Sequence, residues 1–161
     1  MASLDKIKLL LMDCDGVLTD GRLYFSASGE EMKVFDVRDG QGIVSWHKAG
    51  NKSGIISGRG AGEIIRRRAD ELGIEFVKVS SADKVKDCEE ILASLGFGLD
   101  QVAFIGDDIG DIEVMKRVGL AVAVGDGVDA AKKVASYVTK APGGRGAVRE
   151  VIDMILDVQK K

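Results

Sequence analysis

Two acidic clusters in the chain have the residue types and the spacing that a divalent-cation site requires. Asp13 and Asp15 stand two residues apart in the segment LLLMDCDGVLTDG, directly after an apolar run. A second cluster, GDDIGD, begins at Gly106 and follows the apolar run VAFI. Carboxylates this close repel one another, and a bound cation relieves that repulsion. Sites built only from oxygen ligands suit Mg²⁺, which keeps several of its waters and leaves room for a phosphate.

Each cluster taken alone also has a simpler explanation. An aspartate that follows a strand can cap the next helix, while other acids in the same turn are merely solvated. Capping does not explain why both clusters follow apolar strands. In open α/β sheets, ligands bind beyond the carboxyl ends of the strands. The sequence therefore predicts that Asp13, Asp15 and Asp107 converge on one metal ion if their strands are neighbours.

Two further segments carry groups that can bind a phosphate. Ser57 opens the segment SGRGAG after the apolar run GII, and a hydroxyl with main-chain N–H groups at a helix N-terminus can hold such an anion. Lys84 stands in SSADKVKD, at the start of a predicted helix. Taken alone, Lys84 is more typical of a solvated surface than of a binding site.

The elements that must position these residues follow from the alternation of short apolar runs with amphipathic segments. Strands are expected at residues 7–12, around residue 55, and from residues 74, 102, 120 and 137. Of the helices between them, two are expected to end at Gly73 and Gly96, and the last to begin near Ala147. This pattern predicts an α/β fold with a doubly wound, mostly parallel, Rossmann-like sheet. Strand alternation turns Cys14 away from Asp13, so Cys14 is expected in the core.

Residues 22–38 depart from the alternation. They hold two β-rich runs around the polar turn SASGEE, which indicates a β-hairpin. An isolated hairpin is marginally stable in water. Its apolar side chains therefore need a surface to cover, either on the same domain or on another subunit.

The composition argues against several classes of function. The chain has 161 residues, of which 45% are hydrophobic and 30% charged. No apolar run approaches the roughly 20 residues that span a bilayer, and a net charge of −3 argues against a nucleic-acid partner. The N-terminal segment is not typical of a signal peptide, and Cys14 and Cys88 form neither a disulfide framework nor a metal motif. A cytoplasmic protein that binds neither membrane nor nucleic acid is expected.

In order along the chain, Asp-x-Asp-Gly, Ser, Lys and Gly-Asp-Asp-x-x-Asp resemble the four motifs of the haloacid dehalogenase superfamily of phosphatases. The resemblance implies that Asp13 attacks phosphorus and forms an aspartyl-phosphate. Asp15 would then act as the general acid and base. Ser57 and Lys84 would bind the remaining phosphoryl oxygens and stabilise charge in the transition state.

The resemblance also implies how the Mg²⁺ is held. Its ligands would be Asp13, the main-chain carbonyl of Asp15, and Asp107. Asp108 and Asp111 would lie behind these ligands and orient Lys84 and metal-bound water.

Many members of the superfamily insert a cap domain over the substrate, but this chain has no interval long enough for one. One hairpin and one helix fill the interval from Asp20 to Ser57, and one helix and one strand fill the interval from Lys84 to Asp107. We therefore expect a single domain over residues 1–161, with a protruding hairpin and no cap. An open site of this kind suits a large substrate, or it needs a roof from elsewhere.

Within the superfamily, the chain is similar to the 3-deoxy-D-manno-octulosonate 8-phosphate phosphatases, which act in lipopolysaccharide biosynthesis. The similarity spans residues 7–158 and is carried by the segments DCDGVLTDG, VFDVRDGQG, ISGR, GDDIGDIEVMKRVGLAVAV and GGRGAVREV. It implies a homotetramer joined through the hairpins, in which the glycine-rich loop 142–146 closes over a neighbour's site. It also implies substrate contacts from Gly58, Arg59, Arg67 and Arg145. Arg67 lies in a run of three arginines that is more typical of a solvated helix face than of a substrate contact.

Three alternatives stay open. This family carries Gln-Gly ahead of the third-motif lysine, where the chain has VSSADK, so a phosphatase of nine-carbon, sialic acid-like ulosonate 9-phosphates is the nearest alternative. Ser57 also replaces a more common threonine, a milder change. A receiver domain, which is a phosphorylation switch and not an enzyme, combines similar residues but takes its phosphorylated aspartate from a later strand. The third is a catalytically silent oligomeric partner of a sugar-nucleotide synthetase, although all four catalytic elements are present.

Overall fold

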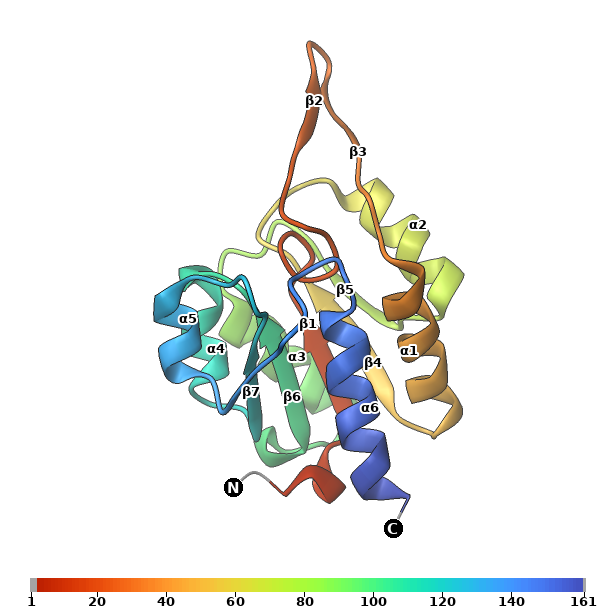
Figure 1. Ribbon diagram of the computed structural model, residues 1–161, viewed down its shortest axis with the longest axis vertical. Helices are drawn as coiled ribbons and strands as arrows, with labels where there is room; N and C mark the ends of the chain where they lie inside the picture. The colour runs from red at the N-terminus through yellow and green to blue at the C-terminus, as the bar shows by residue number, and fades with distance from the viewer. Residues whose placement is uncertain (1–2, 161) are drawn as a thin grey trace.

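Six parallel strands form one sheet in the computed structural model, which describes residues 3–160 without the side chains of residues 30 and 31 (Figure 1). Across the sheet the strands lie in the order β5-β4-β1-β6-β7-β8. Their bounds are β1 (Leu9–Met12), β4 (Lys52–Ile56), β5 (Phe76–Lys78), β6 (Val102–Gly106), β7 (Leu120–Ala123) and β8 (Tyr137–Val138). Counted along the chain within this sheet, the order is 3-2-1-4-5-6, which is the Rossmann order. The predicted doubly wound parallel sheet is confirmed.

Strand β1 lies at the centre of this sheet because both of its faces are apolar. All four of its residues are fully buried, as expected for a strand covered by helices on both sides. Met12 pairs with Ile55 of β4 on one side and with Ile105 of β6 on the other. These three strands therefore end level, and the residues after them emerge at one edge. The strand order reverses between β1 and β6, which is where open α/β sheets bind ligands.

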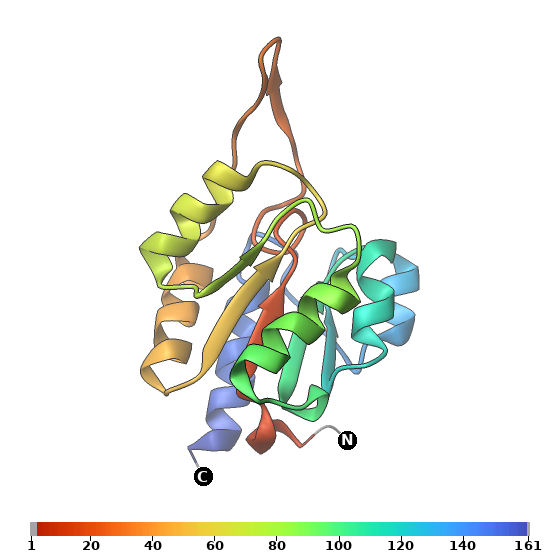
Figure 2. The same ribbon diagram turned by 180° about the vertical axis from the view of Figure 1, so that it is seen from behind.

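Helices cover both faces of the sheet (Figures 1 and 2). One face packs against α1 (Val37–Lys48), α2 (Gly62–Leu72) and α6 (Ala147–Gln159). The other packs against α3 (Lys84–Leu95), α4 (Ile112–Met115) and α5 (Asp129–Val134). Short 3-10 turns complete the chain: η1 (Leu4–Lys6), η2 (Leu99–Gln101) and η3 (Ile109–Asp111). No helix within residues 3–160 combines the length and the apolar character needed to cross a membrane.

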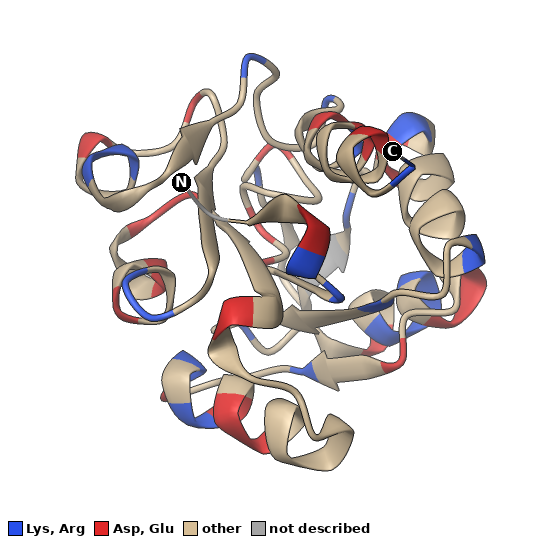
Figure 3. Cartoon of the chain, turned by 90° about the horizontal axis from the view of Figure 1, so that it is seen from below, with Lys and Arg blue, Asp and Glu red and all other residues tan. Residues whose placement is uncertain are grey.

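The predicted helix ends agree with the structure. Gly73 and Gly96 follow α2 and α3 with φ angles of 73° and 68°, a left-handed conformation that glycine adopts without strain. Helix α6 begins at Ala147, as expected. Cys14 is fully buried in the core, also as expected. Seen from the end of the sheet where the strands begin, the outer helices carry charges of both signs (Figure 3).

The hairpin protrudes beyond the edge where the strands end (Figure 1). It consists of β2 (Tyr24–Ser26) and β3 (Gly29–Met32), which pair antiparallel. The predicted span of 22–38 is too long, because α1 begins at Val37. Asp36 caps that helix by accepting a hydrogen bond from the N–H of Arg38 at 2.7 Å, and an aspartate in this position ends the extended segment. Within the described residues, no cap domain lies between β1 and β6.

The glycine-rich loop 142–146 packs against the loop that follows β1 in its own chain. The N–H of Gly144 donates to the carbonyl of Val17 at 2.8 Å. A Cβ at position 143 would lie 1.7 Å from the carbonyl oxygen of Gly16, so only glycine fits there. Buried Asp39 of α1 holds the end of the loop by accepting from the N–H of Gly146 at 3.2 Å. It also accepts from the N–H of Arg149 at 2.9 Å, in the first turn of α6.

Candidate active site

Asp13 and Asp107 converge at the point where the strand order reverses. Asp13 directly follows β1, and its N–H donates to the carbonyl of Ile105 at 3.0 Å, which extends the ladder by one residue. Asp107 directly follows β6. Carboxylate oxygens of Asp13, Asp107 and Asp111 lie within 4.8 Å of one another. The carboxylate of Asp15 is outside this group, and the metal ligand predicted from Asp15 is its main-chain carbonyl.

The arrangement of oxygens fits a hard divalent cation. Oδ1 of Asp107 is buried and accepts no hydrogen bond from the described residues, and such an oxygen is costly to desolvate unless a cation or a proton meets it. Burial and then the Asp111 charge raise the pKa of Asp13 to about 6. Burial, followed by the charges of Asp13 and Asp111, raises the pKa of Asp107 to about 8. The site thus concentrates negative charge that an ion such as Mg²⁺ would neutralise.

Asp111 holds the lysine of the site and the loop of the second cluster together. It is fully buried, and its Oδ1 accepts from Nζ of Lys84 at 2.7 Å. Its Oδ2 accepts from the N–H groups of Asp107 and Asp108, at 2.9 and 3.2 Å. Both carboxylate oxygens of Asp111 therefore have partners, and through them Asp111 holds the Lys84 ammonium and the main chain at Asp107 and Asp108 in place. This geometry agrees with the expectation that Asp111 orients Lys84.

Lys84 reaches the nucleophile position from the first residue of α3. Its Nζ lies 2.9 Å from Oδ2 of Asp13, and its side chain is 10% exposed. Burial acts to lower the pKa of Lys84, but the charges of Asp13 and Asp111 outweigh it, and the pKa is raised. The ammonium is therefore charged throughout the neutral range and can hold a phosphoryl oxygen. Asp108 instead caps η3, because its Oδ1 accepts from the N–H of Ile109 at 2.7 Å.

Ser57 approaches from the neighbouring strand. It directly follows β4, is 1% exposed, and its Oγ accepts from the N–H of Arg59 at 3.3 Å. Together these groups border a hollow of about 270 Å³, which is lined by Asp13, Asp15, Ser57, Gly58, Arg59, Lys84, Asp107, Asp108, Ile109 and Gly110. The structure therefore gathers the predicted catalytic residues around one cavity.

Two predicted substrate residues lie elsewhere. Arg67 is exposed on α2 and does not line this hollow. Arg145 borders a separate hollow with Asp20 and Arg38, and its carbonyl accepts from Arg38 at 3.3 Å. Within one chain, neither arginine reaches the site, because α2 turns Arg67 outward and the loop of Arg145 packs beside residues 16–19.

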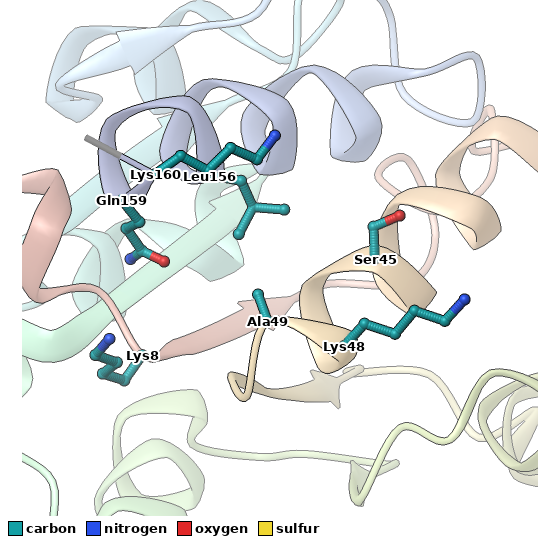
Figure 4. Close-up of a pocket in the computed structure, with 7 residues that line it drawn as sticks. All are labelled: Lys8, Ser45, Lys48, Ala49, Leu156, Gln159 and Lys160. Atoms are coloured by element: carbon teal, nitrogen blue, oxygen red, sulfur yellow. The ribbon is translucent and has the colours of Figure 1, made fainter.

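A larger hollow of about 470 Å³ lies at the opposite end of the sheet (Figure 4). It is lined by Lys8, Ser45, Lys48, Ala49, Leu156, Gln159 and Lys160. The lining contains no carboxylate for a metal ion, and the ammonium groups of Lys8, Lys48 and Lys160 lie apart from one another (Figure 4). This hollow therefore lacks the chemistry of the smaller one.

Sequence reasoning missed one residue of the site. Nζ of Lys33, just after β3, lies 2.5 Å from Oδ1 of Asp15. Oδ2 of Asp15 lies 3.5 Å from Nε of Arg59. No local spacing could reveal the contact with Lys33, because the two residues are 18 positions apart and the hairpin is polar around its turn. Only the course of the hairpin brings them together.

Gly16 provides a test of the metal site. It has a φ of 89°, and a Cβ there would lie 2.0 Å from Oδ2 of Asp107. Gly16→Ala is therefore expected to displace Asp107 and to weaken Mg²⁺ binding at least about tenfold, measured by titration calorimetry. Gly50→Ala is the matched control, because Gly50 has a similar φ of 85° but nothing within 4 Å of its Cβ position. Equal Mg²⁺ affinities in all three proteins would contradict the assignment of Asp107.

Comparison with known proteins agrees with this geometry. The family model of the haloacid dehalogenase-like hydrolases matches residues 63–152, more than half of the chain. The chain belongs to the haloacid dehalogenase-like hydrolases. The predicted membership is confirmed. The receiver alternative is wrong, because the family differs and because receivers have the strand order 2-1-3-4-5, whereas this sheet has the order 3-2-1-4-5-6.

Individual haloacid dehalogenase-like hydrolases match along nearly the whole chain. The 3-deoxy-D-manno-octulosonate 8-phosphate phosphatase of Yersinia pestis is 46% identical over 155 residues, which cover 96% of this chain and 82% of that protein. Its crystal structure superposes with a TM-score of 0.95 and covers 98% of this chain and 85% of that one. The phosphatase of the same name from Moraxella catarrhalis, solved with a magnesium ion, a phosphate ion and a KDO molecule, is 37% identical. Its TM-score is 0.94, with 98% of this chain and 90% of that chain covered.

Proposed function

We propose that this chain is a Mg²⁺-dependent phosphomonoesterase that hydrolyses 3-deoxy-D-manno-octulosonate 8-phosphate in lipopolysaccharide biosynthesis. The observation that carries the proposal is the convergence of Asp13, Asp107 and Lys84 at one edge of the sheet, with Nζ of Lys84 2.9 Å from Asp13. The named activity of relatives that match over nearly the whole chain supports the choice of substrate.

In the proposed reaction, a carboxylate oxygen of Asp13 attacks phosphorus, and the bond from phosphorus to the sugar oxygen breaks. Asp15 gives a proton to that oxygen, because an unprotonated alkoxide is a poor leaving group. Asp15 then takes a proton from the water that attacks the aspartyl-phosphate, which releases phosphate and restores Asp13. Lys84 and Ser57 hold the other phosphoryl oxygens while negative charge develops on them.

Mg²⁺ would be held by Asp13, the main-chain carbonyl of Asp15, and Asp107. When bound, it neutralises charge on the phosphoryl group and on the nucleophile. Asp111 keeps Lys84 directed at Asp13 through its 2.7 Å contact with the lysine. Asp108 would contribute by shaping the turn that follows Asp107.

The sugar-acid part of the substrate would extend from the open side of the hollow. Gly58 and Arg59 line the hollow, and the guanidinium of Arg59 would offer a planar donor to an anionic sugar acid. Arg67 and Arg145 would contribute only through an assembly of subunits, because neither lines the hollow of its own chain.

One domain, residues 1–161, would carry all the steps of the reaction. The two free, buried cysteines fit a reducing cytoplasm.

A panel of three phosphate esters tests the proposed substrate. Phosphate release is measured with Mg²⁺ on the eight-carbon ulosonate 8-phosphate, a nine-carbon ulosonate 9-phosphate, and a pentose 5-phosphate that lacks a carboxylate. We expect kcat/KM to be at least about tenfold higher for the eight-carbon substrate than for either of the others. A preference for the nine-carbon substrate would favour the alternative, and no turnover of any ester would favour a silent partner.

The hairpin supports a proposed homotetramer. Its apolar side chains are exposed in the single chain: Leu23, Tyr24, Phe25, Met32 and Val34. Several exposed apolar side chains on one protruding hairpin are typical of a subunit interface.

Phe25→Asp tests that interface. Phe25 is 65% exposed, and burying an aspartate between subunits costs its hydration, so the variant is expected to dissociate into smaller species in light scattering. Val158→Asp, at an exposed position on α6, is expected to keep the size of the parent. A parent protein that is monomeric at micromolar concentration would contradict the tetramer.

A further inference from the structure

The hairpin places a buried cation against the proposed general acid. Lys33 follows β3 directly, and its side chain is 1% exposed, although lysine usually keeps its ammonium in water. Its Nζ donates to Oδ1 of Asp15 at 2.5 Å. Burying an ammonium is costly unless a partner compensates for the lost hydration. The contact with Asp15 supplies such compensation, so the position of the hairpin and the position of this carboxylate are linked.

The two oxygens of Asp15 have different surroundings. Oδ1 is held by Lys33, whereas Oδ2 is buried and accepts no hydrogen bond from the described residues. Nε of Arg59 lies 3.5 Å from Oδ2, which is an ion pair without a hydrogen bond. Asp15 lines the same hollow as Asp13 and Lys84. Lys33 therefore fixes one oxygen and leaves the other available for proton exchange with a group in the hollow.

We propose that Lys33 is a positioning residue for proton transfer by Asp15, which makes the hairpin part of the catalytic apparatus of its own chain. The inference rests on the proposed function, in which Asp15 protonates the leaving oxygen and later accepts a proton from water. Lys33 does not touch the substrate in this scheme. It holds the Asp15 carboxylate in the orientation that presents Oδ2. A carboxylate without this contact would rotate among several orientations, and fewer of them would be productive.

The dependence of the rate on the leaving group separates this role from others. An alkyl phosphate needs protonation of its leaving oxygen, whereas p-nitrophenyl phosphate releases a stabilised phenolate without it. Because general acid catalysis contributes about 10²–10⁴-fold, we expect Lys33→Met to lower the single-turnover rate of leaving-group release, which reports only the first step, about 10- to 100-fold on the sugar-acid phosphate. On p-nitrophenyl phosphate we expect this rate to change by less than about threefold. Lys33→Arg keeps the cation and is expected to restore most of the rate on the sugar-acid ester.

Two further variants complete the design. Asp15→Asn is expected to show the same selectivity between the two esters, and adding Lys33→Met to it is expected to cause no further loss on either ester. Lys52→Met is the control, because Lys52 pairs with Glu75 on the exposed surface, with its side chain 45% exposed. It is expected to match the parent on both esters.

Each result decides one question. Equal losses in the rate of leaving-group release on both esters for Lys33→Met, or a loss of substrate affinity alone, would mean that Lys33 binds substrate or only supports the hairpin, and would overturn the proposal. Further loss in the double variant would also overturn it. If Asp15→Asn itself failed to discriminate between the esters, the role proposed for Asp15 would fall, a failure distinct from that of Lys33. Thermal unfolding of every variant identifies any loss that comes from unfolding.

Discussion

Replacing Asp13 with asparagine is expected to lower phosphate release from the sugar-acid ester by at least about 10⁴-fold, because loss of a covalent nucleophile has effects of this size. An amide is a far weaker nucleophile than a carboxylate and cannot form the aspartyl-phosphate. It also removes one negative ligand from the cluster around Asp107 and Asp111. The measurement is phosphate release over hours at saturating Mg²⁺, compared with the parent protein.

Asp13→Asn is not expected to unfold the protein. Burial raises the pKa of Asp13 to about 6, so the ionised form is disfavoured in the metal-free fold, and a neutral amide of similar shape removes that cost. We expect the midpoint of thermal unfolding to be unchanged or higher. The matched control is Asp70→Asn, the same exchange at an exposed position of α2, which is expected to keep full turnover. Turnover by Asp13→Asn close to that of the parent would rule out the nucleophile assignment.

The sequence could predict the sheet and the acids at its edge because both depend on local patterns. Apolar runs bounded by polar turns define strands such as β1 and β6, and their burial on both faces implies covering helices. Once these strands are adjacent, residues directly after them must meet. The convergence of Asp13 and Asp107 is thus a consequence of position along two strands, which is readable without coordinates.

Elements that are short, or that depend on distant contacts, could not be predicted in this way. Helices α4 and α5 have four and six residues, too few for a period of 3.6 to be recognised. The buried cap that Asp39 provides to α6 joins residues 107 and 110 positions apart. The contact of Lys33 with Asp15 likewise depends on where the hairpin folds back. Arg67 and Arg145 were predicted from family resemblance alone, and for Arg145 that resemblance implied a loop that closes over a neighbouring subunit, which a single chain does not show.

The second large effect expected of this site is a steep dependence of Mg²⁺ affinity on pH. In the metal-free protein, burial and then the charges of neighbouring carboxylates raise the pKa of Asp107 to about 8. At pH 7 this carboxyl is mostly protonated, and Mg²⁺ must displace the proton. The association constant is therefore expected to rise about tenfold per pH unit from pH 6 to 8, with about one proton released per ion near pH 7. Calorimetry in buffers of different ionisation enthalpy measures both quantities.

The raised pKa values of Asp13 and Asp107 also determine how the stability of the fold depends on pH. An unfolded aspartate titrates near 3.8, whereas Asp13 and Asp107 in the fold titrate near 6 and 8. Between pH 3.8 and pH 8 the folded protein binds more protons than the unfolded chain. The contribution of Asp13 and Asp107 to the free energy of unfolding therefore decreases as pH rises through this range. Mg²⁺ removes the repulsion that causes the decrease, so the gain in the unfolding midpoint on adding Mg²⁺ is expected to be larger at pH 8 than at pH 6. Asp107→Asn should lose the pH dependence and the proton release between pH 7 and 8, where Asp13 is already ionised, while Asp70→Asn should keep them. An affinity independent of pH, with no proton released, would show that Asp107 does not bind the ion as a carboxylate.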